Sequence, residues 1–168
     1  MTQQPEFSRP VPVDRIGPTG MDQRIEASAG ECAALARRLG VPEVRAFAAA
    51  FHLAPQEGGR VAARGRLSGR LVRECVVTLD LFEVPVDEAF AIVFVPETLL
   101  DEAIDLEGDD EIPFAGGTID LGEAAAEQLA LTLDPYPRRP GAALPAAARE
   151  EPESPFAALA RRGTLPGH

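Results

Sequence analysis

The sequence contains no lysine, no tryptophan and only one tyrosine, and aromatic residues make up 5% of the chain. This shortage of aromatic side chains predicts a modest hydrophobic core. Cysteine is also scarce, because Cys32 and Cys75 are the only thiols among 168 residues. Two cysteines cannot form the disulfide framework of a small secreted protein, so we expect reduced thiols that pack as small hydrophobic groups.

Long apolar runs and enzyme motifs are missing as well. No stretch approaches the roughly 20 apolar residues that a membrane-spanning helix requires, and the start, MTQQPEFSRPVPVDRIG, lacks the apolar part of a signal peptide. The chain also lacks a glycine-rich phosphate loop, a GxSxG motif and a closely spaced pair of histidines. We therefore expect a cytoplasmic, non-enzymatic protein with no membrane partner, no small-molecule substrate and no cofactor.

Charge is the most informative property of the whole chain. The formal net charge is −11, but residues 1–73 contain 11 arginines and 7 acidic residues, residues 74–137 contain 17 acidic residues and no arginine, and residues 138–168 contain 5 arginines and 3 acidic residues. All 16 basic residues are arginine. Guanidinium groups suit phosphate binding, although a GC-rich genome produces the same bias. The charge pattern leaves both explanations open.

The N-terminal part combines an irregular start with a clear helix signal. Residues 1–10 are polar and interrupted by proline, so we expect them to be disordered or loosely docked. In SAGECAALARRLG, Ser28 and Glu31 have the spacing of a capping box, and Gly40 is a stop signal. This pattern predicts a helix over residues 29–39.

A second helix is predicted over residues 120–132, with Asp120 as its N-cap and the Asp134-Pro135 pair as its stop. The acidic stretch before it, ETLLDEAIDLEGDDEIPFAGG, is expected to form an irregular solvated loop. An EF-hand calcium loop needs glycine at its sixth position, but the glycine comes fourth when the loop is counted from Asp105. The sequence therefore predicts no calcium site there.

Alternating apolar residues predict strands between about residues 44 and 95. In VRAFAAAFHLAP one parity holds Phe47, Ala49, Phe51 and Leu53, and the other holds Ala46, Ala48, Ala50 and His52, although the many alanines would also permit a helix. CVVTLDLFEVPVDEAFAIVFVP is expected to supply further strands, separated near Pro85. We predict an α+β fold, in which a curved antiparallel and partly barrel-like sheet is covered by two or three helices and followed by a flexible C-terminal tail.

The stretch RVAARGRLSGRLVREC carries arginine at even positions and apolar or small residues at odd positions. Because successive side chains of a strand point to opposite faces, the even-numbered arginines share one face and form a candidate phosphate track. We expect a bend or bulge at Gly65 and Gly69. Alternatively, these arginines pair with acids of DLFEVPVDEAF on a neighbouring strand. The candidate RNA-binding residues are Arg60, Arg64, Arg66 and Arg70, with Arg73 as a further candidate.

The C-terminal part differs in composition from the rest. PRRPGAALPAAAREEPES is typical of a flexible linker, and the following PFAALARRG is a short amphipathic segment, too short to form a stable helix alone. We expect a domain over residues 1–140 and a flexible tail over residues 141–168. Phe156 and Leu159 of the tail are candidates for docking on the same molecule or on a partner.

Two blocks of the sequence together resemble one protein family. GRLSGRLVRECVVTLDLFEVPVDEAFAIVFVP and, after the acidic stretch, IDLGEAAAEQLALTLDPYPRRPGA are similar to the YceD family, the large ribosomal RNA subunit accumulation proteins. The resemblance covers roughly residues 5–142. It implies a non-enzymatic bacterial protein that supports the processing or assembly of large-subunit ribosomal RNA, with ribosomal RNA precursor or ribosomal and assembly proteins as partners.

One departure from the family concerns metal binding. Many members carry a Cys-x-x-Cys pair where this chain has VREC, with Val72 in place of the first cysteine, and they carry a second pair that is missing here. A tetrahedral zinc site needs four ligands. We therefore expect Cys75 to be a packed thiol and the protein to bind no metal.

Two functional hypotheses follow. In the first, the arginine-lined strand contacts ribosomal RNA precursor directly, through phosphates and without reading bases. In the second, the protein is an adaptor whose acidic segment, Glu97 to Glu111, engages a basic ribosomal or assembly protein while the tail binds in a groove.

Overall fold

The computed structural model describes residues 5–99 and 110–143. Its main sheet has five strands in the order β2-β3-β4-β5-β6, of which β2 to β5 form antiparallel neighbours and β6 runs parallel to β5. A second, two-stranded sheet pairs β1 with β7. The strands are β1 Pro10–Pro12, β2 Met21–Glu26, β3 Glu43–Pro55, β4 Val61–Glu74, β5 Leu81–Pro96, β6 Asp110–Phe114 and β7 Thr118–Asp120.

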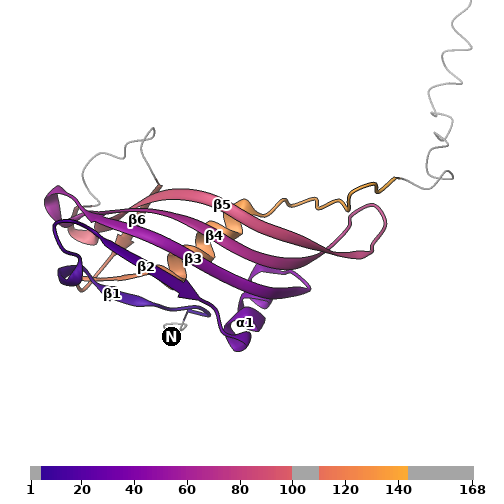
Figure 1. The fold of residues 1–168 in the computed structure, drawn as a ribbon, viewed down its shortest axis with the longest axis horizontal. Coiled ribbons are helices and arrows are strands. Elements are labelled where there is room, and N and C mark those ends of the chain that lie inside the picture. Colours follow the sequence, from indigo (N-terminus) through magenta and orange to yellow (C-terminus); the bar gives the residue numbers. More distant parts are fainter. Residues whose placement is uncertain (1–4, 100–109, 144–168) are drawn as a thin grey trace, which may run out of the picture.

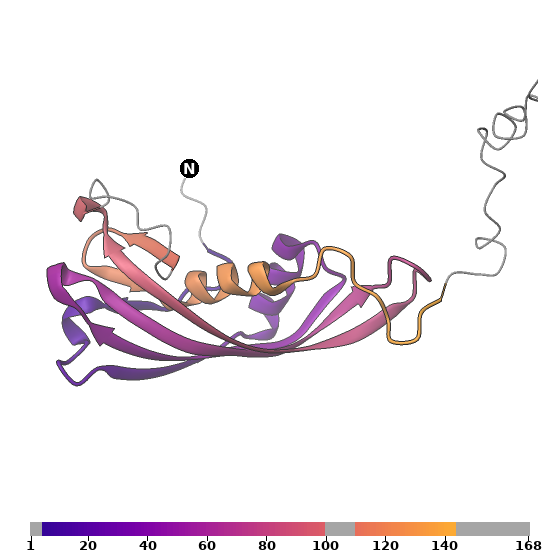
Figure 2. The ribbon, with the colours of Figure 1, turned by 90° about the horizontal axis from the view of Figure 1, so that it is seen from above.

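Two α-helices, α1 (Ala29–Leu39) and α2 (Leu121–Thr132), complete the fold together with three short 3-10 turns. These turns are η1 Val13–Arg15, η2 Glu57–Gly59 and η3 Glu97–Leu99. Figure 1 shows the long, curved strands β3, β4 and β5 running side by side. In Figure 2 both helices and the small β1–β7 sheet lie on one side of the main sheet, and no described element covers the other side. We call these two sides the covered face and the uncovered face.

The covered face is apolar because every second residue of the long strands points toward the helices. In β4 the residues Val61, Ala63, Leu67 and Leu71 are all at most 1% exposed, and they form one core with side chains of both helices. The uncovered face takes the residues between them. The alternation of apolar and polar residues in the sequence therefore decides which side chains lie on the covered face and which lie on the uncovered face.

The α+β class is confirmed, but the sheet does not close into a barrel. Within the described residues, β2 and β6 are the two ends of an open sheet, and two helices cover it. The predicted sheet was purely antiparallel, whereas β6 joins β5 in parallel. The stretch Asp110–Phe114, which the sequence analysis assigned to an irregular loop, is thus a strand.

Both predicted helices are confirmed, and their caps explain their limits. At α1, the Ser28 hydroxyl accepts a hydrogen bond from the Glu31 backbone, and the Glu31 carboxylate accepts one from the Ser28 backbone, which is the predicted capping box. Gly40 ends this helix in the left-handed conformation, with φ of 64°. At α2, the Asp120 carboxylate accepts hydrogen bonds from the backbone of Gly122 and Glu123.

The register of β4 is unbroken at Gly65 and Gly69, so the predicted bulge is wrong there; the register shift lies in β3, between Val44 and Ala46. The glycines of β4 serve close packing instead. A Cβ atom on Gly65 would lie 2.4 Å from the carbonyl oxygen of Ala50 and 2.4 Å from Cζ of Phe90, whose ring crosses over the glycine to meet Phe51. The missing side chain thus makes room for an aromatic pair on the covered face.

Three local expectations also change. Residues 75–80 form a turn rather than a strand, in which Leu79 has a φ of 60°. Pro85 does not interrupt β5, which runs unbroken through it. Phe7, in the segment expected to be loosely docked, is fully buried and packs edge-on against Phe47. The N-terminal segment therefore belongs to the core.

Both cysteines are free and buried, as expected. No helix within residues 5–99 and 110–143 is long and apolar enough to span a membrane. The predicted tail segment, with Phe156 and Leu159, lies outside the described residues.

Candidate nucleic-acid interface

Strand register places the arginines of β4 in rows that cross the uncovered face. Residues that are partners in neighbouring strands lie side by side on the same face, so each row can be read from the pairing. Four consecutive rows, read from β2 or β3 toward β5, are Asp22-His52-Arg64-Ala91, Arg24-Ala50-Arg66-Ala89, Glu26-Ala48-Ser68-Asp87 and Ala46-Arg70-Pro85. The arginines thus stand in the middle of the sheet.

Alanine occupies most positions next to these arginines. Because a methyl group is short, the guanidinium groups project above their neighbours and are open to a large ligand. We call this set the alanine floor; it consists of Ala46, Ala48, Ala50, Ala89 and Ala91. The four rows contain no phenylalanine, tyrosine or tryptophan, and their one aromatic ring is that of His52, so the face offers no continuous stacking platform for bases.

Arg64 and Arg70 are exposed, and neither forms an ion pair with a carboxylate among the described residues. Arg66 is different, because its Nε donates to the Asp87 carboxylate. This hydrogen bond raises the pKa of Arg66 and lowers the pKa of Asp87. The alternative of pairing with acids of the neighbouring strand therefore applies to Arg66 but not to Arg64 or Arg70.

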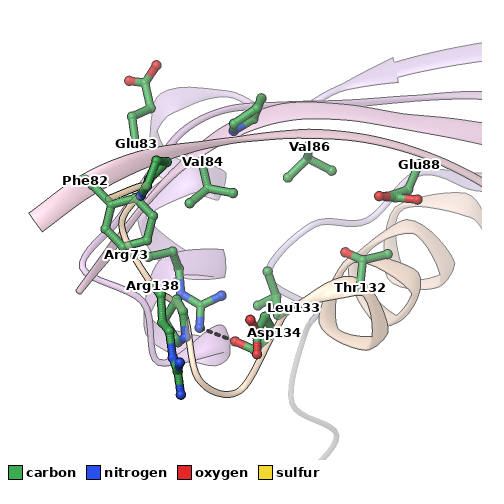
Figure 3. Close-up of a pocket in the computed structure, with 13 residues that line it drawn as sticks. Arg73, Phe82, Glu83, Val84, Val86, Glu88, Thr132, Leu133, Asp134 and Arg138 are labelled. Carbon is green, nitrogen blue, oxygen red and sulfur yellow. Dashed lines mark hydrogen bonds between the residues drawn. The ribbon is translucent and has the colours of Figure 1, made fainter. Parts of the chain in front are cut away.

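The two remaining candidates lie away from this group. Arg60 precedes β4 at the β6 side of the sheet, where its Nη1 is 3.3 Å from a carboxylate oxygen of Glu111. Arg73 has odd parity, and it points to the covered face, where its Nη2 donates to the Asp134 carbonyl oxygen at 2.8 Å (Figure 3). The structure therefore brings together Arg64, Arg66 and Arg70, with Arg60 at the margin and Arg73 on the other face.

The sequence analysis missed two contributors to this face. Arg24 of β2 lies in the same row as Arg66, separated from it by the small Ala50. His52 stands beside Arg64, and its Nδ1 is 2.7 Å from a carboxylate oxygen of Asp22. In MDQRIE the charged residues Asp22, Arg24 and Glu26 stand at every second position, and this alternation indicates that Arg24 lies on the polar face of a strand. Only strand pairing could show which other arginines lie beside it.

The surroundings of the two cysteines bear on metal binding. Burial raises the pKa of the Cys32 thiol. Hydrogen bonds, first from the side chain of Thr78 and then from the backbone of Arg139, lower the pKa of Cys75 to about 7. The Arg139 nitrogen is 3.4 Å from the Cys75 sulfur. In residues 5–99 and 110–143, no group of three or more histidine, cysteine or acidic side chains could hold a metal ion.

A comparison with models of known protein families assigns the chain to a family. The sequence model described as "Large ribosomal RNA subunit accumulation protein YceD" matches residues 63–161, more than half of the chain. The chain belongs to the YceD family. That name implies a role in the accumulation of large-subunit ribosomal RNA, and it describes no enzyme. No curated protein and no solved structure gave a significant match. The matched region begins in β4 and includes Arg64, Arg66 and Arg70.

Proposed function

We propose that this YceD protein supports the accumulation of large-subunit ribosomal RNA by binding the RNA precursor directly on its uncovered face. Arg64, Arg66 and Arg70 bind phosphates, and Arg24 extends the same surface toward β2. The observation that carries the proposal is the exposure of Arg64 and Arg70 above the alanine floor without a carboxylate partner among the described residues. Guanidinium groups in this state add no ion-pair stabilisation to the fold.

The spacing of the arginines suits a phosphate backbone. Side chains two positions apart on a strand are separated by about 7 Å, so Arg64 and Arg66 can bind successive phosphates while Arg70 binds one farther along. Since His52 is the only aromatic ring in the four rows and is held by Asp22, the contact reads mainly the backbone and the shape of the RNA rather than its bases. We therefore expect binding that is salt-sensitive and largely independent of sequence.

The acidic net charge of the chain does not prevent this contact. The four rows contain the acidic side chains Asp22, Glu26 and Asp87, and strand register places further acids, Glu43, Glu74, Glu83 and Glu111, on the same face, so the face is mixed in charge and its affinity for RNA should be modest. At about 0.1 M salt the Debye length is roughly 10 Å, so charges farther away are largely screened. The exposed Arg66 to Asp87 pair contributes little to stability, and a phosphate can replace the carboxylate.

A matched pair of variants tests the proposal. The full chain is titrated with large-subunit RNA fragments over a series of salt concentrations, together with Arg64→Gln/Arg70→Gln and with Arg15→Gln/Arg37→Gln. The second pair changes the charge equally, at exposed positions outside the β4 rows. Loss of two phosphate contacts should lower the slope of log affinity against log salt by about 1.4 for single-stranded RNA. The control should keep the wild-type slope.

Two results would refute direct RNA contact through this face. One is undetectable affinity for the wild-type chain even at low salt, and the other is an equal effect of the two double variants. Either result would favour the alternative function, an adaptor that binds ribosomal or assembly proteins through its acidic segment and its tail. Most of that acidic segment, as well as Phe156 and Leu159, lies outside the described residues.

A further inference from the structure

A groove of about 360 Å³ lies on the covered face, at the end of the sheet beyond α2. One wall is the first half of β5, and the other is the segment that follows α2, from Thr132 to Pro140. Figure 3 shows Val84, Val86 and Glu88 pointing from β5 into the groove, with Leu133 and Asp134 opposite them. Apolar side chains therefore line the middle of the groove, and charged side chains lie toward its two ends.

The β5 wall is also an open strand edge. Strand β6 pairs only with Ile92–Pro96, so Leu81–Ala91 has no strand neighbour on the side away from β4 among the described residues. An exposed edge of this length invites pairing with another chain unless something covers it. Leu81 and Tyr136, near this end of the sheet, are 60% and 69% exposed. The unpaired strand edge and the exposed apolar side chains both indicate a surface that binds a peptide segment or another protein.

The charges of the groove have an order. Arg73 is the partner of Phe82 at one end of the β5 wall, and Arg138 lies beside it in Figure 3. Glu88, at the other end, is the partner of Leu67 and has no ion pair within the described residues. Asp134 lies beside Arg73, and Glu83 points to the other side of β5, where it pairs with Arg45. Two arginines and one acid thus mark the end near the β4–β5 turn, and the acid Glu88 marks the end near α2.

We propose that this groove binds the chain's own C-terminal segment, EEPESPFAALARR, residues 150–162. Phe156 and Leu159 occupy the apolar middle of the groove. The acids at the start of the segment, Glu150, Glu151 and Glu153, meet Arg73 and Arg138, and Arg161 and Arg162 meet Glu88. The order of charges along the segment is therefore complementary to the order of charges along the groove.

The dimensions of the segment agree with this placement. From Phe82 to Glu88 the β5 wall is about 20 Å long at the rise of a strand. From Glu153 to Arg161, a helix would extend about 12 Å, and the long side chains at both ends cover the remainder. An amphipathic segment too short to be stable alone gains its partner surface by docking.

The position of the tail makes docking within one molecule favourable. Pro140 lines the groove, and the described chain ends three residues later, at Ala143. Six residues, 144–149, lie between the described chain and the docked segment, and a flexible chain of that length has a root-mean-square span of about 13 Å, which suits a groove that begins next to its attachment point. The effective concentration of such a tethered segment is on the order of millimolar, so even a weak intrinsic affinity fills the groove.

A second copy of the chain fits this surface less well. Two β5 edges placed together would bring Glu83, Asp87 and Glu88 of both copies close to one another, and Pro85 lacks the N–H that a new strand pair needs. The C-terminal segment instead carries Arg161 and Arg162, which can pair with Glu88 of the groove. Docking of the tail also covers the open edge and so protects the protein from association through β5.

Spin labelling of the full chain tests the proposal. A nitroxide is attached through Thr164→Cys, since the native Cys32 and Cys75 are buried, and the wild-type chain treated with the same label serves as the control for reaction at those thiols. Paramagnetic broadening should be strongest at the amides around Glu88 and Thr132 and should decrease toward Phe82. Broadening elsewhere, no broadening, or the reverse gradient would overturn the proposal.

Variants then separate docking from mere proximity. Phe156→Ala/Leu159→Ala, placed in the tail where it cannot disturb the domain, should abolish the broadening. Glu88→Arg and Arg161→Glu/Arg162→Glu should each reduce it, and the combination of the two should restore it. A sample that mixes isotope-labelled chains with spin-labelled, isotope-free chains detects exchange between molecules. If the same broadening appears in that mixture, the tail binds a second copy and the proposal is wrong, whereas docking within one molecule leaves the mixture without broadening.

Discussion

The two faces of β4 use the same strand for different purposes. On the covered face, Leu67 and Leu71 are at most 1% exposed and belong to the core. On the uncovered face, Arg64 and Arg70 alternate with them in sequence but contact no carboxylate among the described residues. One row of side chains therefore contributes to stability, and the other remains available for binding.

Two arginines on the covered side contrast with Arg64 and Arg70. On the covered side, Arg9 donates to both carboxylate oxygens of Glu31, and Arg38 does so with Glu123 and also reaches Glu6. These two arginines connect the N-terminal segment and the helices. The comparison teaches that the type of residue does not reveal its role, whereas the presence or absence of a carboxylate partner does.

Truncation of a covered-face side chain should have the largest effect. Leu67→Ala removes a fully buried side chain from the core, and we expect the free energy of unfolding to fall by about 2–5 kcal/mol. The neighbouring uncovered-face change Ser68→Ala should alter it by less than about 0.5 kcal/mol. Urea unfolding curves of the two variants measure the difference. Similar losses for both would show that the faces do not differ as described.

Filling the space above Gly65 should be the next largest effect. A Cβ at this position meets a backbone oxygen and the Phe90 ring, each at 2.4 Å, so Gly65→Ala should destabilise the protein by about 1–3 kcal/mol through overpacking. The control is Gly30→Ala in α1, where a Cβ meets nothing within 4 Å and where alanine should stabilise the helix by about 0.5–1 kcal/mol. Thermal unfolding should shift in opposite directions for the two variants.

Acid titration tests the ion pairs on the covered side. The hydrogen bond from Arg9, with a further contribution from Ser28, lowers the pKa of Glu31 from 4.5 to about 2. Because the folded state holds this carboxylate ionised, its stabilisation is present above pH 4.5 and is lost as the pH falls toward 2. Glu31→Gln should therefore lower the free energy of unfolding by about 1 kcal/mol at pH 7 and have almost no effect near pH 2. A constant difference at all pH values would contradict this assignment.

The smallest expected effect concerns the one β4 arginine that is paired within the rows of the uncovered face. Asp87→Asn removes the carboxylate bound to Arg66 and leaves it free for phosphate, so RNA affinity should rise two- to threefold, a change of about 0.5 kcal/mol. Asp14→Asn makes the same change of charge at an exposed position outside the sheet. If both variants raise affinity equally, the gain comes from net charge and not from the release of Arg66.

Much of the fold could be predicted from local signals. The ends of α1 follow from Ser28, Glu31 and Gly40, since the hydrogen bonds that cap a helix join residues a few positions apart. The alternation in β4 likewise predicted the burial of Val61, Ala63, Leu67 and Leu71, although Val72, at an even position, is buried as well. Parity alone also separates Arg73 from the even-numbered arginines. These features depend on backbone geometry within one element.

Other features could not be predicted because they depend on residues far apart in the chain. The burial of Phe7 requires β1 to pair with β7, more than 100 residues later. Strand β6 is short and joins β5 in parallel, and the sequence contains no local turn signal for such a crossover. The grouping of Arg24 with Arg66 needs the pairing of three strands. No pattern within a single strand contains this information.

The sequence by itself determined the helix ends, the α+β class and the division of β4 into an apolar and an arginine-bearing side. Only the tertiary structure decided that no described element covers the second side, and that Asp87 neutralises Arg66 while Arg64 and Arg70 have no such partner within residues 5–99 and 110–143. It also decided that, within the same residues, the first half of β5 is an open edge beside a groove. The physical reason is the range of the interactions. Caps and alternation act over a few residues, whereas burial and ion pairing depend on which distant segments the core brings together.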